Sequence, residues 1–149
     1  MYTYQADLLR IIDGDTVDAL IDLGFSVRVK VRIRMMGINT PESRTRNKKE
    51  KVKGLDSKKR LVELLEANDN KFLMRSTEKG KYGRYLADMF TEVENYPSEH
   101  YCDYQDITKS HKLTEKVRLE HVSDSKEYIW INKQLISEGY AVEYFGGKR

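Results

Sequence analysis

The stretch SVRVKVRIRMMGINTPES, residues 26–43, alternates apolar and cationic side chains and then breaks at a Pro-Glu turn. Alternation with a period of two residues is typical of a half-buried β-strand. We therefore expect a strand with one apolar and one basic face, ending beside the carboxylate of Glu42. The apolar face would comprise Val27, Val29, Val31, Ile33 and Met35, and the basic face Arg28, Lys30, Arg32 and Arg34.

Positive charge is concentrated in this strand and in the segment that follows it. The formal net charge of the chain is only +3, yet residues 28–60 hold 13 of its 27 lysines and arginines and only three acids. Concentrated positive charge attracts polyanions and speeds their capture. The composition therefore favours a nucleic acid as partner, and a lysine-rich solvated surface is the alternative.

The remaining composition bears on the cellular compartment. Cys102 is the only cysteine, which rules out an intramolecular disulfide and fits a reducing compartment. Met1 leads directly into YTYQADLLRII without a cationic leader, and no apolar run approaches the ~20 residues that span a bilayer. We expect a soluble, intracellular or cytoplasmic monomer with no membrane contact.

Five strands are predicted along the chain. Asp-Gly and Leu-Gly turns separate the first three strands, which predicts an antiparallel meander. The expected strands cover residues 2–12, 17–22, 26–35, 71–76 and 84–90.

Two helices complete the predicted fold. From Asn47 to about Ala67, leucines recur at the i, i+3, i+4 spacing of an amphipathic helix. Residues 131–140 predict a short helix with Asn132 as N-cap and Gly139 as its end. We therefore expect an α+β fold, a five-stranded Greek-key barrel of the OB type with two or three helices.

Residues 91–127 interrupt this pattern within a single domain that spans residues 1–149. They hold nine acids against five lysines and arginines and show little apolar periodicity. We expect an acidic insertion that is partly disordered or a polar excursion. Its tyrosines offer contacts to a protein partner, and its histidines and cysteine are expected to be solvated because their spacing fits no common zinc site. The tyrosines are Tyr101, Tyr104 and Tyr128, and the weighed zinc ligands are His100, Cys102, His111 and His121.

Two acidic turns can meet at one end of such a barrel. Asp13 and Asp15 follow the first strand, and Glu42 follows the third, beside the oxygens of Asn39 and Thr40. Hard divalent cations prefer several oxygen ligands, carboxylates among them. The pattern therefore indicates a cation site, although Asp-Gly-Asp-Thr is equally common as plain turn chemistry.

Two arginines add a binding element for phosphate. Arg34 ends the basic strand, and Arg84 follows the turn KGKYG at the start of a later strand. The planar guanidinium group matches phosphate oxygens with two parallel hydrogen bonds. The alternative for each arginine alone is a surface ion pair.

Four segments together resemble the staphylococcal nuclease-like (thermonuclease) family. The segments IDGDTV, RIRMMGINTPES, KGKYGR and INKQLISEGYA occur in the family's order and at similar spacing, covering roughly residues 4–90 and 128–145. The resemblance implies a calcium-dependent phosphodiester hydrolase, an endonuclease that cuts DNA and RNA with little sequence preference. Another divalent cation could take the place of calcium.

The resemblance also implies roles for individual residues. Asp15 and the carbonyl of Thr40 match the metal ligands, and Glu42 matches the glutamate that positions or deprotonates the attacking water. Arg34 and Arg84 match the two phosphate-binding arginines. The remaining matches are Asp13 as an acid behind the ligands, Lys81 and Tyr82 as nucleotide contacts, and Tyr144 or Phe145 as a base-stacking ring.

Asn39 departs from the family, which has aspartate at this position. An amide oxygen can coordinate a hard cation but brings no charge, so we expect weaker metal binding. The alternative is a non-catalytic OB-type module that binds nucleic acid through a degenerate metal site. Retention of Glu42, Arg34 and Arg84 favours the enzyme, and the expected intracellular location would fit a phage or mobile-element origin.

Overall fold

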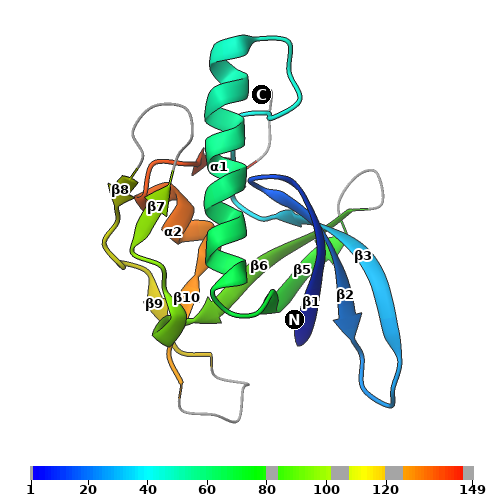
Figure 1. Ribbon diagram of the computed structural model, residues 1–149. Coiled ribbons are helices and arrows are strands. Elements are labelled where there is room, and N and C mark those ends of the chain that lie inside the picture. Colours follow the sequence, from blue (N-terminus) through cyan, green and yellow to red (C-terminus); the bar gives the residue numbers. More distant parts are fainter. Residues whose placement is uncertain (1, 80–83, 102–107, 120–125, 146–149) are drawn as a thin grey trace.

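The structure is a computed structural model that describes residues 2–79, 84–101, 108–119 and 126–145 (Figure 1). The barrel strands and the two α-helices are β1 (Tyr2–Asp13), β2 (Thr16–Asp22), β3 (Arg28–Met35), α1 (Lys48–Glu66), β5 (Lys71–Lys79), β6 (Arg84–Glu92) and α2 (Ile131–Ser137). The shorter elements are β4 (Ile38–Asn39), the 3-10 helix η2 (Val93–Asn95), β7 (Glu99–Tyr101), β8 (Thr108–Ser110), β9 (Lys116–Val117), β10 (Tyr128–Trp130) and β11 (Val142–Glu143).

Five strands close into a barrel, which confirms the predicted OB-type α+β fold. The antiparallel order is β3-β2-β1-β5-β6, and a parallel pairing of β3 with β6 closes the barrel. The strand β10 continues the sheet beyond β6, and β9 pairs with β10. No helix in the described part of the chain is both long and apolar enough to cross a membrane.

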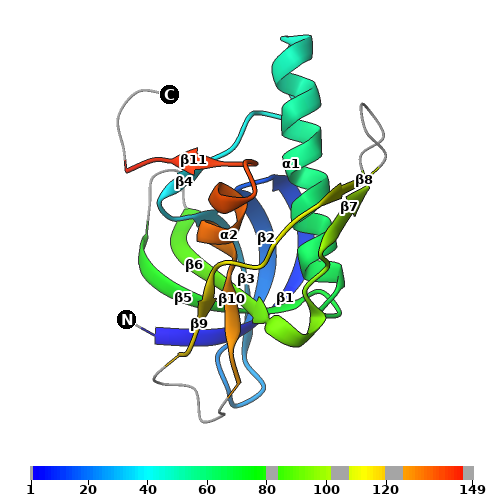
Figure 2. The same cartoon turned by 90° about the vertical axis from the view of Figure 1, so that its left-hand side faces the viewer.

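The helix α1 lies against the barrel and extends beyond it at its N-terminal end (Figures 1 and 2). Leu61, Leu64 and Leu65 are at most 1% exposed and belong to the same core cluster as the barrel interior. The Asn47 side chain accepts hydrogen bonds from the backbone N–H groups of Lys49 and Glu50, an N-cap that fixes where the helix begins. The predicted helix is confirmed.

The second helix begins differently from the prediction. Its N-cap is Trp130, which makes no capping hydrogen bond with its side chain. The Asn132 side chain instead accepts from Met89 N at 3.0 Å and donates to Met36 O at 2.8 Å, so it ties α2 to the barrel. The N-cap prediction for Asn132 is therefore wrong. Gly139 follows the helix end with φ of 86°, as predicted.

The basic strand β3 is only half inside the barrel. Ile33 and Met35 are fully buried, whereas Val27 and Val29 are 49% and 41% exposed because the β2–β3 hairpin projects from the barrel (Figure 1). The predicted apolar face is therefore buried only toward the C-terminal end of the strand.

Two cations of β3 are paired with acids of the neighbouring strands. Arg32 donates two hydrogen bonds to Asp18 of β2, and this interaction lowers the pKa of the Asp18 carboxyl below its ordinary value. Arg28 lies 3.7 Å from Asp7 of β1. Part of the basic face is thus neutralised within the sheet, and Arg34 at its end has a different environment.

The described part of the segment after β6 packs against the helices. Its strands β7 and β8 pair antiparallel, and His100 of β7 is fully buried between Asp56 and Glu63 of α1. His111 has a side chain only 9% exposed, and its Nε2 atom lies 2.8 Å from the Tyr140 hydroxyl. The prediction of solvated side chains is wrong for these two histidines.

A buried arginine on α1 explains why this segment packs there. The Arg60 side chain is fully buried and donates to the carbonyls of Pro97 and Glu99 at 2.7 and 3.2 Å. Its Nε atom donates to Glu138 at the end of α2 at 2.5 Å. Because a buried guanidinium must satisfy its donors, Arg60 fixes the segment 97–99 against both helices.

One of the aromatic contacts expected in this segment is also wrong. Tyr128 is only 5% exposed, so it does not offer a surface contact to a partner. Cys102, Tyr104 and His121 lie outside the described residues, as does the side chain of Tyr101.

Candidate functional site

The site is built around the buried carboxylate of Asp15, in the turn between β1 and β2. Asp15 is 2% exposed, and its Oδ1 atom accepts a hydrogen bond of 2.9 Å from the Thr16 hydroxyl. Its Oδ2 atom accepts one of 2.9 Å from the backbone N–H of Thr40. The carboxylate thereby joins the Asp-Gly-Asp-Thr turn to the segment that follows β4.

The last arginine of β3 lies against the same carboxylate. The Nη2 atom of Arg34 is 3.3 Å from Asp15 Oδ2 and 3.3 Å from Asn39 Oδ1, and Nη1 donates to Met35 O at 2.9 Å. The Arg34 side chain is 13% exposed. Asp15, Arg34, Asn39 and Thr40, predicted from separate segments, therefore meet in one place.

A second aspartate holds the Pro-Glu loop. Asp13 Oδ1 accepts hydrogen bonds from the backbone N–H of Ser43, at 3.2 Å, and from the Ser43 hydroxyl. On the other side of the loop, Glu50 of α1 accepts from the backbone N–H of Glu42 at 3.4 Å. The backbone of Glu42 is thus fixed between β1 and α1.

Close contact between this loop and α1 depends on Gly54. A Cβ atom at this position would lie 2.3 Å from the carbonyl oxygen of Glu42. Glycine inside a helix costs roughly 1 kcal/mol relative to alanine, and here it permits the helix to pack directly on the loop backbone. Ser43, Glu50 and Gly54 were not predicted as parts of the site, although a glycine inside a predicted helix was a signal.

Arg84 is placed by the parallel pairing of β3 with β6. It is opposite Arg32, while Leu86, two residues further along β6, is opposite Arg34. Residues two apart in a strand point to the same face, so Arg84 shares its face of the barrel with Arg32 and Arg34. Lys81 and Tyr82, the predicted nucleotide contacts, lie outside the described residues.

The predicted stacking residues, Tyr144 and Phe145, directly follow β11 and lie close to the site. The strand β11 pairs with β4, Val142 being opposite Asn39, and the backbone N–H of Tyr144 donates to Gly37 O at 2.9 Å. Phe145 is 77% exposed. Both aromatic residues are therefore beside the segment 37–39 that carries Asn39.

The donor set suits a hard cation in kind but has little charge. The carboxylate of Asp15, the amide oxygen of Asn39 and the carbonyl of Thr40 are all oxygen donors, as calcium and magnesium require. In the described residues, no three His, Cys, Asp or Glu side chains group as a metal centre. The set fits a cation held through one carboxylate and neutral oxygens, and Arg34 lies against that carboxylate.

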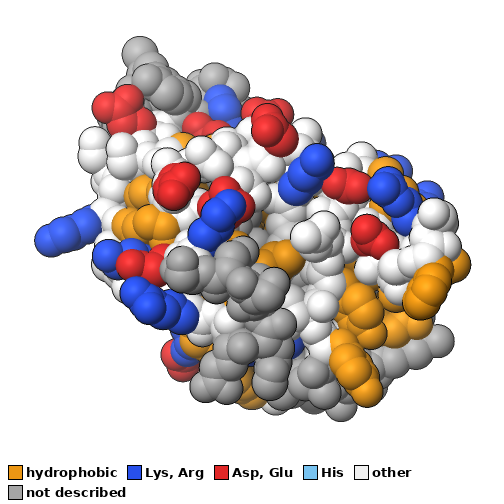
Figure 3. Space-filling model, turned by 90° about the horizontal axis from the view of Figure 1, so that it is seen from below, with side chains coloured by type: hydrophobic (Ala, Val, Ile, Leu, Met, Phe, Trp, Pro, Cys, Tyr) orange, Lys and Arg blue, Asp and Glu red, His pale blue; other side chains and the backbone are white. Residues whose placement is uncertain are grey.

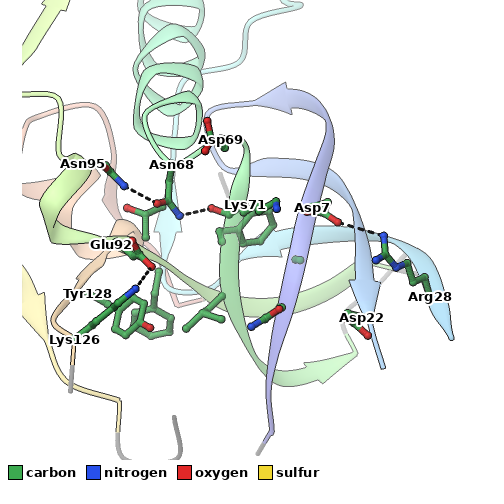
Figure 4. A pocket seen from close by; sticks show the side chains of 16 residues that line it. Asp7, Asp22, Arg28, Asn68, Asp69, Lys71, Glu92, Asn95, Lys126 and Tyr128 are labelled. Atoms are coloured by element: carbon green, nitrogen blue, oxygen red, sulfur yellow. Dashed lines mark hydrogen bonds and ion pairs between the residues drawn. The ribbon is translucent and has the colours of Figure 1, made fainter. Parts of the chain in front are cut away.

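A groove of about 690 Å³ is lined by Asn39, Thr40 and Glu42, by the N-terminal part of α1 and by residues 139–142. A second hollow, of about 510 Å³, lies on the lower side of the barrel (Figures 3 and 4). Lysines, arginines and acids are interspersed on that lower face, and the rim charges are paired as Arg28 with Asp7 and Lys126 with Glu92. None of the predicted site residues lines this second hollow, so the groove is the better candidate.

Comparison with known proteins agrees with the OB-type barrel fold described above. The family model described as staphylococcal nuclease homologue matches residues 32–149, well over half of the chain. The chain therefore belongs to the staphylococcal nuclease homologue family. A search of curated proteins gave no match.

Proposed function

We propose that this protein is a metal-dependent phosphodiesterase, an endonuclease that cleaves DNA and RNA with low sequence specificity. The observation that supports the proposal best is the contact of Arg34 with both Asp15 and Asn39. It brings a phosphate-binding group and cation-binding oxygens together, and both are needed for hydrolysis of a phosphodiester.

The chain's own residues supply the proton transfer and the stabilisation of charge. Glu42 accepts a proton from the attacking water, and a positioned general base contributes about 10²–10⁴-fold. Arg34 and Arg84 donate hydrogen bonds to the phosphate oxygens, whose charge grows in the transition state, and each contributes about 10²–10³-fold. Because phosphodiester hydrolysis is intrinsically slow, several such groups must act together.

Asp15, Asn39 and the carbonyl of Thr40 would hold the cation, which we propose to be calcium or another divalent ion. When bound, such a cation offsets negative charge on the phosphate and orients the water. Asp13 stabilises the arrangement from behind, through its hydrogen bonds to Ser43.

The alternative is a non-catalytic module that binds nucleic acid on the same barrel. One observation favours it, namely that the amide of Asn39 leaves Asp15 as the single carboxylate of the donor set. The two functions differ in whether cation binding leads to strand cleavage.

The test is degradation of single-stranded DNA and RNA by the purified protein with calcium, with magnesium or with a chelator. Glu42→Gln is the control, because it removes the base and keeps the shape of the side chain. We expect cleavage that requires the cation and is lost in the control. Tight binding without cleavage under either cation would support the alternative instead.

A further inference from the structure

The groove beside the candidate site has two chemically different walls. The lysine wall is formed by Lys49 and Lys53 of α1, and the apolar wall by Ala141 and Val142 at the end of the chain. The segment 39–42 of the candidate site also lines the groove. We propose that the groove binds one strand of the nucleic-acid substrate next to the scissile phosphate, an inference that rests on the proposed function.

The spacing of the two lysines suits a phosphate backbone. Lys49 and Lys53 are four residues apart on α1, so they lie on the same face of the helix and about 6 Å apart along its axis. Both residues are exposed. Consecutive phosphates of an extended single strand are separated by a comparable distance, so each lysine can contact one phosphate.

The surrounding charge favours a polyanion. Arg44, Arg46 and Lys48 are exposed around the same end of α1, which projects beyond the barrel (Figures 1 and 2). Glu42 and Glu50 also line the groove, and the Glu50 carboxylate accepts the backbone N–H of Glu42. The local excess of positive charge therefore attracts a phosphate backbone.

The apolar wall suits the bases of the same strand. Val142 is 63% exposed and lies next to the buried Ala141 and Tyr140. Unpaired bases present flat, largely apolar faces, and proteins bind single strands by combining such contacts with a basic track. A strand with its phosphates toward Lys49 and Lys53 and its bases toward Val142 satisfies both walls.

A smaller hollow extends the groove toward the segment that follows β6. This hollow, of about 270 Å³, shares Pro41, Lys53 and Tyr140 with the groove and reaches Lys109 of β8. The ammonium group of Lys109 lies 3.1 Å from Asp56. The insertion thus contributes to the far end of the binding surface.

The test is a measurement of binding that needs no catalysis. The affinity for a fluorescein-labelled 12-nucleotide single strand is measured by anisotropy in a chelator, over a series of salt concentrations. The double variant Lys49→Ala/Lys53→Ala is compared with Lys51→Ala/Lys58→Ala, which removes the same charge. Lys51 and Lys58 are seven residues apart on the helix face away from the groove, and neither lines it.

We expect the groove variant to bind about tenfold more weakly at ~0.1 M salt. The slope of its log affinity against log salt concentration should be smaller by roughly 1.4, about 0.7 for each lost phosphate contact. The control variant should keep the slope of the unchanged protein. Equal losses in the two variants would overturn the groove but leave the proposed cleavage standing. If the protein without substitutions binds the strand but does not cleave it, the proposed nuclease function is refuted and the binding groove stands. If it binds no nucleic acid, both proposals are refuted.

Discussion

Arg34 lies 3.3 Å from a carboxylate oxygen of Asp15. The proposed phosphate-binding group and the proposed cation ligand are therefore in direct contact. A cation at Asp15 would compete with Arg34 for the carboxylate, because both are positively charged. Cation binding would then weaken the hold of Asp15 on Arg34 and favour its contact with a phosphate.

This contact predicts opposite effects of Arg34→Ala on two measurements. Loss of the guanidinium removes a competing positive charge, so the affinity of the site for calcium should rise several-fold. Turnover should nevertheless fall by about 10²–10³-fold, because a donor to the phosphate is lost. Calorimetric titration with calcium and an assay of DNA cleavage check the two effects, and weaker calcium binding would contradict the predicted competition.

Asn39→Asp adds the carboxylate that the family has at this position. Calcium affinity follows the number of charged ligands, so the concentration needed for half-maximal activity should fall roughly tenfold. The measurement is cleavage rate against free calcium for both proteins. An unchanged or higher requirement would mean that Asn39 is not among the ligands.

Arg84→Ala should lower turnover by about 10²–10³-fold while the fold stays intact, because one donor to the developing charge is removed. Arg32→Ala is the matched control, since Arg32 is opposite Arg84 in the sheet but is engaged by Asp18. The check is kcat on single-stranded DNA together with the circular dichroism spectrum. Equal effects of the two variants would place Arg84 outside the site.

Arg60→Ala should destabilise the protein strongly. Glu138, with a side chain only 2% exposed, would keep a buried charge without its arginine, and such losses cost about 3–5 kcal/mol. Arg32→Ala breaks a more exposed pair and should cost about 0–1 kcal/mol. Urea unfolding of both variants gives the comparison, and a loss below about 1 kcal/mol for Arg60→Ala would contradict the role of Arg60 in fixing the insertion.

Stability should fall in mild acid because of His111. Burial lowers the pKa of His111, although the nearby Glu138 acts in the opposite direction and Arg60, His100 and Lys109 reinforce the shift. As the pH falls, the unfolded chain therefore binds the proton first. The contribution of neutral His111 to the free energy of unfolding is complete above pH ~6.5 and is lost as the pH falls below this value. Urea midpoints at several pH values should show a smaller acid loss for His111→Gln, and an equal loss would assign the effect to other groups.

The barrel and the centre of the site were predictable because their signals are local. Alternation predicts a strand, Asp-Gly predicts a turn, and the leucine spacing predicts α1, each within a window of a few residues. The meeting of Asp15 and Arg34 then follows from the antiparallel pairing of β2 with β3, which places Thr16 opposite Arg34. Asn132 shows the limit of this reasoning, since a good capping residue is used to bind the backbone of β6 and of Met36.

The packing of the insertion was not predictable, because its interactions join residues far apart in the chain. Arg60 contacts the carbonyls of Pro97 and Glu99, and His100 contacts Asp56 and Glu63. In the sequence, the side chains of Arg60, Asp56 and Glu63 look like ordinary surface charges. Only the fold shows that they satisfy one another in a buried network.

The contact between Gly54 and the carbonyl of Glu42 has a consequence for tracing distant relatives of this chain. The helix can approach the loop only if the residue twelve positions after the glutamate lacks a side chain. A relative with a larger residue there must carry a longer loop or a shifted helix, and its groove would be wider. The glutamate–glycine spacing is thus a fingerprint by which chains with this same groove can be recognised from sequence.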